Sequence, residues 1–190
     1  MYFIEERIKR TVDELGRYRY VDTERIEVYR MKQASFTGGE RPDDDTGAWE
    51  VFLPASRWGG RDRTCWFSTE IRIPARFEGK TVVYKVSTGR EGEWSTLNPQ
   101  FLVFVNGAAM QGLDTNHTEV ILSENALAGE IYRIDLKAHS GMKDGTVELN
   151  SWITTLDREV ETLYYNIKVP LEVAERLNKE DKRRVDILNS

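Results

Sequence analysis

The chain has 190 residues, a formal net charge of -5 and a hydrophobic content of 39%. This length and composition predict one domain with a real core. The acidic balance excludes a general attraction to nucleic acid or anionic lipid, and the single cysteine, Cys65, excludes an intrachain disulfide. The charged N-terminus does not fit a signal peptide, and no apolar run approaches a membrane span. We therefore expect a soluble, cytoplasmic protein.

The first predicted part, residues 1–20, is an amphipathic helix with a lead-in. Its apolar residues Ile4, Ile8, Val12 and Leu15 recur at helical spacing among charged side chains. A strand is predicted over residues 25–31, where the side chains alternate between two faces.

Residues 37–47 are predicted to form a loop, because turn-forming residues dominate them. Asp43, Asp44 and Asp45 could ligate a hard cation. The simpler interpretation is a solvated turn.

Short strands follow at intervals of about ten residues, which is typical of an all-β sandwich. Asn106-Gly107 is a hairpin signal that allows a positive φ at the turn. No βαβ alternation is present, which argues against a parallel sheet. The strands are predicted at residues 49–53, 64–73, 81–87, 100–105, 119–122, 131–138 and 146–155. The sandwich domain is predicted to span residues 21–156.

The last predicted part, residues 157–190, is a helical linker. Pro170 should kink its main helix, predicted over residues 156–177, or start a second helix at Leu171. The apolar stripe is wider than one edge of a sandwich needs, so we interpret the helix as a connector toward a missing domain beyond Ser190. The stripe consists of Val160, Leu163, Ile167, Leu171, Ala174 and Leu177.

The block from Trp58 onward resembles the N-terminal domain of family 38 α-mannosidases, of the bacterial and cytosolic or vacuolar branch. The tail around residues 163–174 resembles the helical link into the catalytic barrel of that family. The motifs that carry the resemblance are Trp58-Gly59-Gly60, Trp66-Phe67, Ile73-Pro74, Glu78-Gly79-Lys80, Gly92-Glu93-Trp94, Val105-Asn106-Gly107 and Gln111-Gly112-Leu113-Asp114.

The resemblance implies a mainly β fold, a jelly-roll or galactose-binding-like β-sandwich, at the front of a larger glycosidase. It also implies that a separate barrel, the expected partner beyond Ser190, hydrolyses α-mannosides with zinc in mannose catabolism. The family's Gly-His-(Ser/Thr)-His-Ile-Asp run is absent from this sequence. No catalytic or metal-ligating residue is therefore carried over, and we expect this chain to be inactive by itself, with no cofactor of its own.

A looser likeness leads to the sugar-binding sandwich of family 2 β-galactosidases and β-glucuronidases. Both families share an aromatic strand that ends in Ile-Pro, a strand led by Gly79, and the hairpin at residues 105–107. This likeness supports an alternative function, an independent carbohydrate-binding module. The segment at residues 111–114 and the helical tail favour the mannosidase.

Three combinations of residues invite a catalytic or metal-binding interpretation. Asp114 and Glu119 could form the carboxylate pair of a retaining glycosidase, but Asp114 could equally organise a turn through backbone amides. A metal site would need His117 with those two carboxylates, or His117 with His139. Asn116 begins a glycosylation acceptor motif that we consider accidental.

Two further residues invite a nucleophilic role. Ser140 follows His139, but neighbours on a strand point to opposite faces and cannot form the required hydrogen bond. Cys65 lies on a predicted buried strand, where it is expected to act as a small hydrophobe.

The tryptophans are the best functional lead. Trp58 and Trp94 lie beside glycines in predicted loops, where a ring face would be reachable for a sugar or for a neighbouring domain. Trp66 and Trp152 fall in predicted strands and are expected in the core. The candidate residues for carbohydrate or interdomain contact are Trp58, Trp94, Asp114, Asn116 and His117.

These observations lead to a main hypothesis, a non-catalytic domain that braces the barrel, shapes the sugar cleft and contributes to contacts in a homo-oligomer. The alternatives are the carbohydrate-binding module and a structural adaptor with no role in sugar binding.

Overall fold

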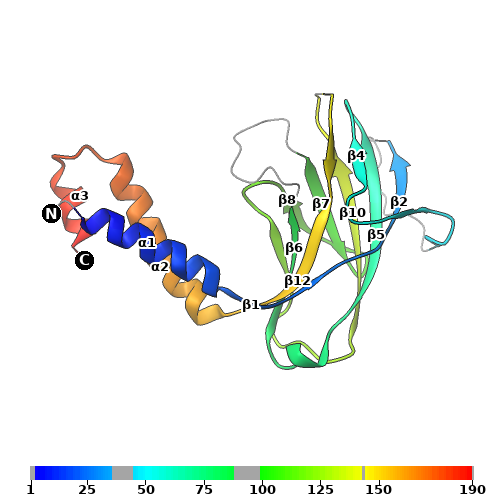
Figure 1. Ribbon diagram of the computed structural model, residues 1–190, viewed down its shortest axis with the longest axis horizontal. Helices are drawn as coiled ribbons and strands as arrows, with labels where there is room; N and C mark the ends of the chain where they lie inside the picture. The colour runs from blue at the N-terminus through cyan, green and yellow to red at the C-terminus, as the bar shows by residue number, and fades with distance from the viewer. Residues whose placement is uncertain (1–2, 36–44, 88–98, 143, 190) are drawn as a thin grey trace. The chain divides into compact units, whose positions relative to one another are not determined.

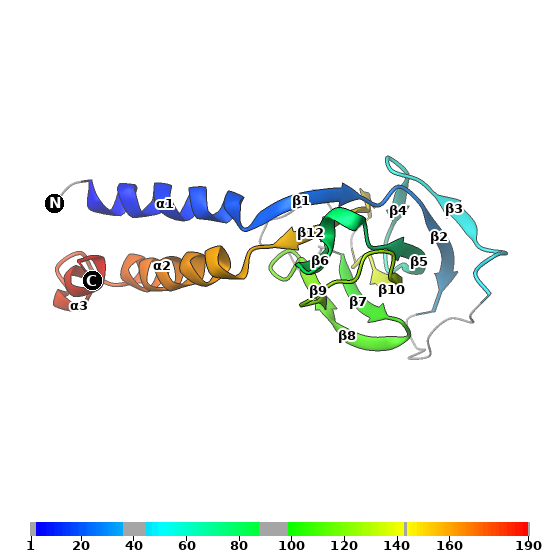
Figure 2. The ribbon, with the colours of Figure 1, turned by 90° about the horizontal axis from the view of Figure 1, so that it is seen from below.

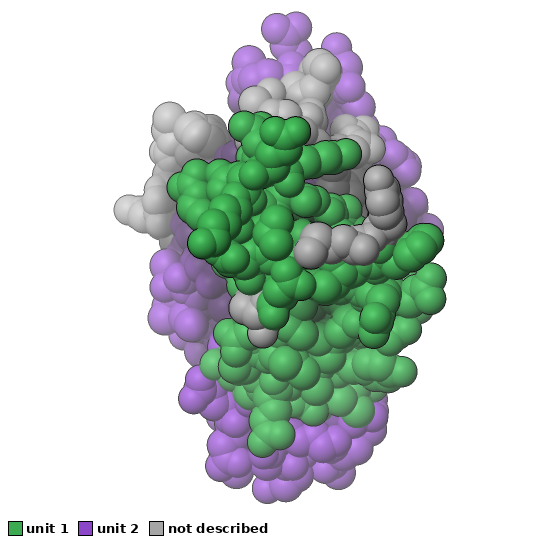
Figure 3. Space-filling model, turned by 90° about the vertical axis from the view of Figure 1, so that its left-hand side faces the viewer, with its two compact units in different colours: residues 1–21, 155–190 green, residues 22–154 purple. Residues whose placement is uncertain are grey.

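The computed structural model describes residues 3–35, 45–87, 99–142 and 144–189. The chain divides into two compact units, which Figure 3 colours separately. One unit contains residues 1–21 and 155–190, and the other contains residues 22–154. The two ends of the chain, which the sequence analysis treats as separate parts, belong to one unit.

The helical unit consists of α1 (Ile4–Tyr18), α2 (Arg158–Arg176) and α3 (Lys182–Leu188). Helices α1 and α2 lie side by side and run in opposite directions, as Figure 2 shows, and α3 packs on α2. The side chain of Asp157 caps α2, because it accepts hydrogen bonds from the amides of Glu159 and Val160, both over 3.0 Å.

Helix α2 continues through Pro170 to Arg176, so the predicted second helix at Leu171 is wrong. Proline removes one backbone donor, which normally favours a break. Here Leu171 and Ala174, in the turns after the proline, are buried. Packing of these residues therefore outweighs the local preference of proline.

The sandwich unit is mainly β, as predicted, and Figure 1 shows its strands. A four-stranded sheet has the order β1-β12-β6-β9, a six-stranded sheet has the order β3-β2-β5-β10-β7-β8, and β11 pairs with β4. The bounds are β1 Tyr20–Arg25, β2 Tyr29–Ala34, β3 Glu50–Phe52, β4 Arg57–Gly59, β5 Thr64–Arg72, β6 Thr81–Ser87, β7 Gln100–Val105, β8 Ala108–Leu113, β9 Glu119–Ser123, β10 Ile131–His139, β11 Thr146–Glu148 and β12 Asn150–Leu156, with a 3-10 turn at Ala75–Phe77.

Most predicted strands are confirmed, with four differences. The strand predicted over residues 146–155 is in fact two strands, β11 and β12, which belong to different sheets. The strand predicted over residues 25–31 is wrong, because β1 ends at Arg25 and β2 begins at Tyr29. Strands β4 and β8 were not predicted. The hairpin signal is confirmed, since Asn106 and Gly107 join β7 to β8 with φ values of 49° and 83°.

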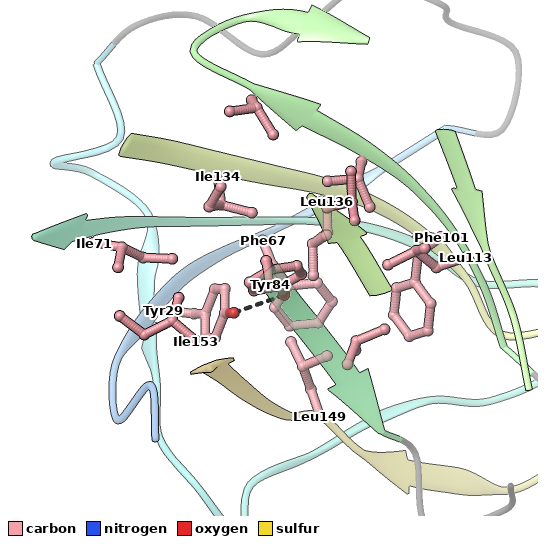
Figure 4. Packing of buried hydrophobic residues seen from close by; sticks show 14 of the residues in the cluster. Tyr29, Phe67, Ile71, Tyr84, Phe101, Leu113, Ile134, Leu136, Leu149 and Ile153 are labelled. Atoms are coloured by element: carbon pink, nitrogen blue, oxygen red, sulfur yellow. Dashed lines mark hydrogen bonds between the residues drawn. The ribbon is translucent and has the colours of Figure 1, made fainter. Parts of the chain in front are cut away.

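The core of the sandwich consists of the side chains that face inward from the two sheets (Figure 4). Phe67 on β5, Leu136 on β10 and Val103 on β7 are fully buried and paired in register across the sheet. Cys65 belongs to the same cluster, and burial raises the pKa of its thiol. Its predicted role as a small buried hydrophobe is therefore confirmed.

Among the described residues, no helix is both long enough and apolar enough to cross a membrane.

Candidate functional site

The outer face of the six-stranded sheet, the face opposite the core, carries an ordered row of side chains. Since Phe67, Leu136 and Val103 point into the core, their neighbours along each strand point outward. The strand register aligns Trp66 on β5 with Lys137 on β10, and Lys137 with Leu102 on β7. Leu102 in turn pairs with Gly112 on β8.

This row leads into a hollow of about 390 Å³, which we call the outer pocket. It lies over β10, β7 and β8, and its volume is that of a small-molecule site. Carboxylate, ammonium, imidazole and amide groups surround a partly apolar floor. The lining residues are Thr64, Gln100, Phe101, Leu102, Gly112, Leu113, Asp114, Lys137 and His139.

Asp114 lines the outer pocket and also organises the turn that follows β8. Its Oδ1 accepts hydrogen bonds from the amides of Asn116 (2.7 Å) and His117 (2.8 Å), and His117 Nδ1 lies 3.3 Å from it. Burial alone would raise the pKa of Asp114, but these bonds from His117 and Asn116 outweigh it and lower the pKa. The interpretation of Asp114 as a turn-organising residue is confirmed.

An aromatic cluster lies on the outer face beside the pocket. It contains Trp49, Trp66 and Phe104, all buried, with the rings of Trp66 and Phe104 5.4 Å apart. Lys137 Nζ lies 5.9 Å from the ring centre of Trp66, within reach of a cation–π interaction. Trp66 is therefore buried as predicted, but outside the main core. Trp152 is only partly buried on β12, so its predicted core position is wrong.

His139 and Ser140 take part in separate networks. His139 Nδ1 lies 3.2 Å from the hydroxyl of Thr64. The hydroxyl of Ser140 donates to the carbonyl of Gly60 over 2.5 Å and accepts from the amide of Arg63 over 3.1 Å. The Ser140 hydroxyl is thus engaged by backbone groups.

The structure corrects the expected setting of Trp58. This residue lies in β4, with an exposed fraction of 3%. Its ring centre is 5.2 Å from that of Phe67 and 5.8 Å from that of Phe101, inside the core. Its ring therefore offers no reachable face. Trp94 lies outside the described residues.

The remaining candidates lie apart from the outer pocket. Asn116 and His117 occupy the exposed turn that Asp114 organises, but neither lines the hollow. Glu119 Oε2 lies 3.6 Å from Lys85 Nζ, in an ion pair. Asp114 and Glu119 are thus each engaged with other groups.

No group of three potential metal-ligating residues occurs within the described ranges. The loop predicted over residues 37–47 is only partly covered by them, because Asp43 and Asp44 lie outside. Asp45 Oδ1 accepts a hydrogen bond of 2.9 Å from the amide of Gly47, as in a solvated turn.

A second hollow, of about 590 Å³, lies where β1 connects to β2. Charged residues of both signs line it, including Arg30, Arg72, Arg133, Glu27 and Glu70. None of the predicted site residues lines this hollow.

Most residues of the outer pocket were not predicted from the sequence. Gln100, Leu102 and Lys137 belong to strands that are distant in sequence and become neighbours only through the sheet order. Their one signal in the sequence is outward alternation, which many solvated strand positions share. Gly112 carries the additional signal of a missing side chain within a strand.

A protein-family comparison matches residues 18–151 to the model described as "Alpha-mannosidase, jelly roll domain". No curated protein sequence matches the chain significantly.

Among solved structures, a β-glucuronidase from Ruminococcus gnavus in complex with D-glucuronic acid is similar in fold, with a TM-score of 0.54 and 12% identity. A glycosyl hydrolase family 2 member from Bacteroides cellulosilyticus has a TM-score of 0.50 and 14% identity. The matches cover 73% and 71% of this chain, but only 30% and 21% of those chains. At these identities the likeness shows the sandwich fold alone.

Proposed function

The chain belongs to the alpha-mannosidase jelly roll domain family, and we propose that it is the non-catalytic N-terminal domain of an α-mannosidase that hydrolyses terminal α-mannosides. The family match over residues 18–151 carries this proposal. In it, the chain braces a catalytic barrel and shapes the approach to the sugar cleft. The zinc ion and the hydrolytic reaction belong to that barrel.

The carboxylates of this chain support a non-catalytic role. A retaining glycosidase needs two carboxyl groups about 5 Å apart, one as nucleophile and one as acid/base. Asp114 is held by the amides of its own turn, and Glu119 is paired with Lys85. The pKa of Asp114 is lowered, whereas a catalytic acid requires a raised pKa.

The proposed contact with the barrel is the exposed apolar side of α2. Leu163, Val169 and Val173 have exposed fractions of 49%, 51% and 47%. These side chains come in addition to Leu171 and Ala174, which are already buried. An apolar surface beyond what the helical unit itself covers is typical of a docking surface.

The first experiment tests the non-catalytic role. Purified chain is incubated with 4-nitrophenyl α-D-mannopyranoside, with and without Zn²⁺, and release of nitrophenol is followed. We expect no turnover under either condition. Zinc-dependent turnover that copurifies with the chain would overturn the proposal.

The second experiment tests the brace in the whole α-mannosidase polypeptide. Val169→Ser and Val173→Ser together should lower the Tm of the catalytic domain and its activity, because they remove apolar contact area. Glu172→Gln on the same helix is the matched control, since Glu172 is exposed and polar. Equal Tm and activity in both variants would exclude the α2 contact.

The cytoplasmic location and the homo-oligomer contacts belong to the same proposal. They agree with the lone buried cysteine and with the exposed apolar side chains, respectively. Size-exclusion chromatography with light scattering measures the subunit count directly.

A second candidate function is an independent carbohydrate-binding module. The outer pocket favours it, because its polar walls and partly apolar floor lie on the sandwich unit itself. This candidate is compatible with the brace, because α2 belongs to the other unit.

A further inference from the structure

The floor of the outer pocket is apolar and open. Leu102 is 39% exposed, and Gly112 lies opposite it on β8. A Cβ atom at Gly112 would meet only the carbonyl oxygen of Phe101, at 3.8 Å, and its φ is not in the left-handed region. A side chain would therefore fit at position 112 without strain, and its absence widens the floor beside Leu102.

The walls of the outer pocket supply both donors and acceptors. The three contacts of the Asp114 carboxylate with Asn116 and His117 all use Oδ1, so its Oδ2 is available as an acceptor. Lys137 brings an ammonium donor, and Gln100 brings an amide that donates and accepts. Hydroxyl groups, which also donate and accept, match this combination.

The charges of the pocket favour a neutral ligand. Asp114 and Lys137 carry opposite single charges, so an anion would meet the carboxylate and a cation would meet the ammonium. A neutral molecule with several hydroxyls can bond to both groups. Its apolar face would then lie on Leu102.

From these features we propose that the outer pocket binds one neutral hexopyranose unit, such as the terminal sugar of a glycan. The carbon–hydrogen face of the ring lies on Leu102 and in the space above Gly112. The ring hydroxyls bond to Asp114, Lys137 and Gln100. This proposal rests on the second candidate function and does not depend on the brace.

The recognition differs from stacking on an indole ring. Trp58 and Trp66, at 3% and 6% exposure, present no free ring face. An aliphatic floor gives less contact area than an indole, so the site discriminates mainly through its hydroxyl partners.

The test is a titration of the full 190-residue chain, labelled with ¹⁵N, with methyl α-D-mannopyranoside. We expect saturable shifts of the amide signals of Leu102, Gly112, Asp114 and Lys137. Gly112→Phe should abolish them, because its ring fills the floor. Met110→Phe is the matched control on the same strand; Met110 is exposed and does not line the pocket, so the shifts should persist.

A second variant tests the hydroxyl partner. Asp114→Asn keeps an oxygen for the amides of the turn, so the chain should still fold. Because the substitution removes the charge, the Kd for methyl α-D-mannopyranoside should rise about tenfold. D-glucuronate and inorganic phosphate serve as charged probes. The proposal requires that both bind more weakly than the mannoside.

Four results would overturn the proposal. They are a lack of saturable shifts in the folded wild-type chain, shifts confined to the second hollow, unchanged shifts in Gly112→Phe, and tighter binding of either charged probe. None of these results would affect the brace, which the whole-enzyme Tm measures separately.

Discussion

The hydroxyl groups of Tyr29 and Tyr84 share a hydrogen bond of 2.8 Å inside the sandwich core, and this bond connects the two sheets (Figure 4). Tyr29 belongs to β2 of the six-stranded sheet, and Tyr84 belongs to β6 of the four-stranded sheet. The Tyr29 hydroxyl also lies 2.6 Å from the hydroxyl of Ser151. Three buried hydroxyl groups thus satisfy one another in the core.

Tyr29→Phe should destabilise the sandwich by about 1–3 kcal/mol, because it leaves the hydroxyls of Tyr84 and Ser151 buried with one partner fewer. Urea denaturation followed by tryptophan fluorescence measures this loss, since all five tryptophans lie within residues 22–154. Tyr18→Phe, at an exposed tyrosine, is the control and should leave the midpoint unchanged. A midpoint for Tyr29→Phe equal to wild type would contradict the role of the shared bond.

Alkaline pH should destabilise the sandwich. Burial raises the pKa of Tyr29 from 10.0 to about 12, against opposing effects of the bonds to Ser151 and Tyr84, and burial raises the pKa of Tyr84 as well. Above pH 10 the unfolded chain loses these protons while the folded chain keeps them. The stability is therefore complete below pH 10 and falls by about 1.4 kcal/mol per pH unit for each tyrosine toward pH 12.

The measurement is the free energy of unfolding from urea curves at pH 9, 10 and 11. The matched variant Tyr29→Phe should lose stability less steeply above pH 10, since it carries one buried tyrosine fewer. An identical slope in wild type and variant would argue against the contribution of Tyr29.

Trp58→Ala should destabilise the sandwich by about 3–5 kcal/mol, because the indole packs on Phe67 and Phe101 in the core. Trp152→Ala, at a partly exposed position, should cost clearly less. The same fluorescence-monitored urea curves apply. Similar losses in the two variants would indicate that the ring of Trp58 is not part of the core.

Arg19→Met should destabilise the helical unit by about 1.5–3 kcal/mol. The guanidinium donates a hydrogen bond of 3.0 Å to Glu161 and lies 4.8 Å and 5.0 Å from the ring centres of Tyr164 and Tyr165. Methionine keeps much of the apolar packing but removes the charge. Thermal unfolding followed by circular dichroism at 222 nm reports on the helices.

Arg158→Met is the control for the Arg19 variant. Arg158 also contacts Glu161, over 2.7 Å, but its side chain is 51% exposed. A solvated ion pair of this kind contributes at most about 1 kcal/mol. If both variants lowered the Tm equally, burial of Arg19 would have no special role.

The sequence predicted the sandwich well, because most strands show the alternation that one buried face imposes. Strand β6 was predicted with its observed bounds, and its inward residues Val82, Tyr84 and Val86 are buried. Strand β4 was missed because its three residues include Gly59, and β8 because its side chains before Leu113 are all exposed. Short or solvated strands carry little periodic signal.

The candidate site was harder to predict than the fold. Asp114 was identified from its turn, but the other walls of the pocket come from strands separated by the hairpin at Asn106 and by β9. Trp58 was predicted in a loop because glycines beside a tryptophan indicate one. Here Trp58 is a buried strand residue, and the two glycines that follow it have φ values of 108° and 110°. Whether such a tryptophan lies in a loop or in a buried strand becomes clear only from the pairing of the strands.

The position of the lone thiol has a practical consequence. Cys65 is buried in the sandwich core, with an exposed fraction of 7% and its pKa raised by burial, so an alkylating reagent reaches a reactive thiolate mainly when the sandwich opens. The rate at which the Cys65 thiol is modified therefore reports how often the sandwich opens in the native protein. Because the chain has no other cysteine, this measurement needs no engineered cysteine and no correction for the modification of other thiols.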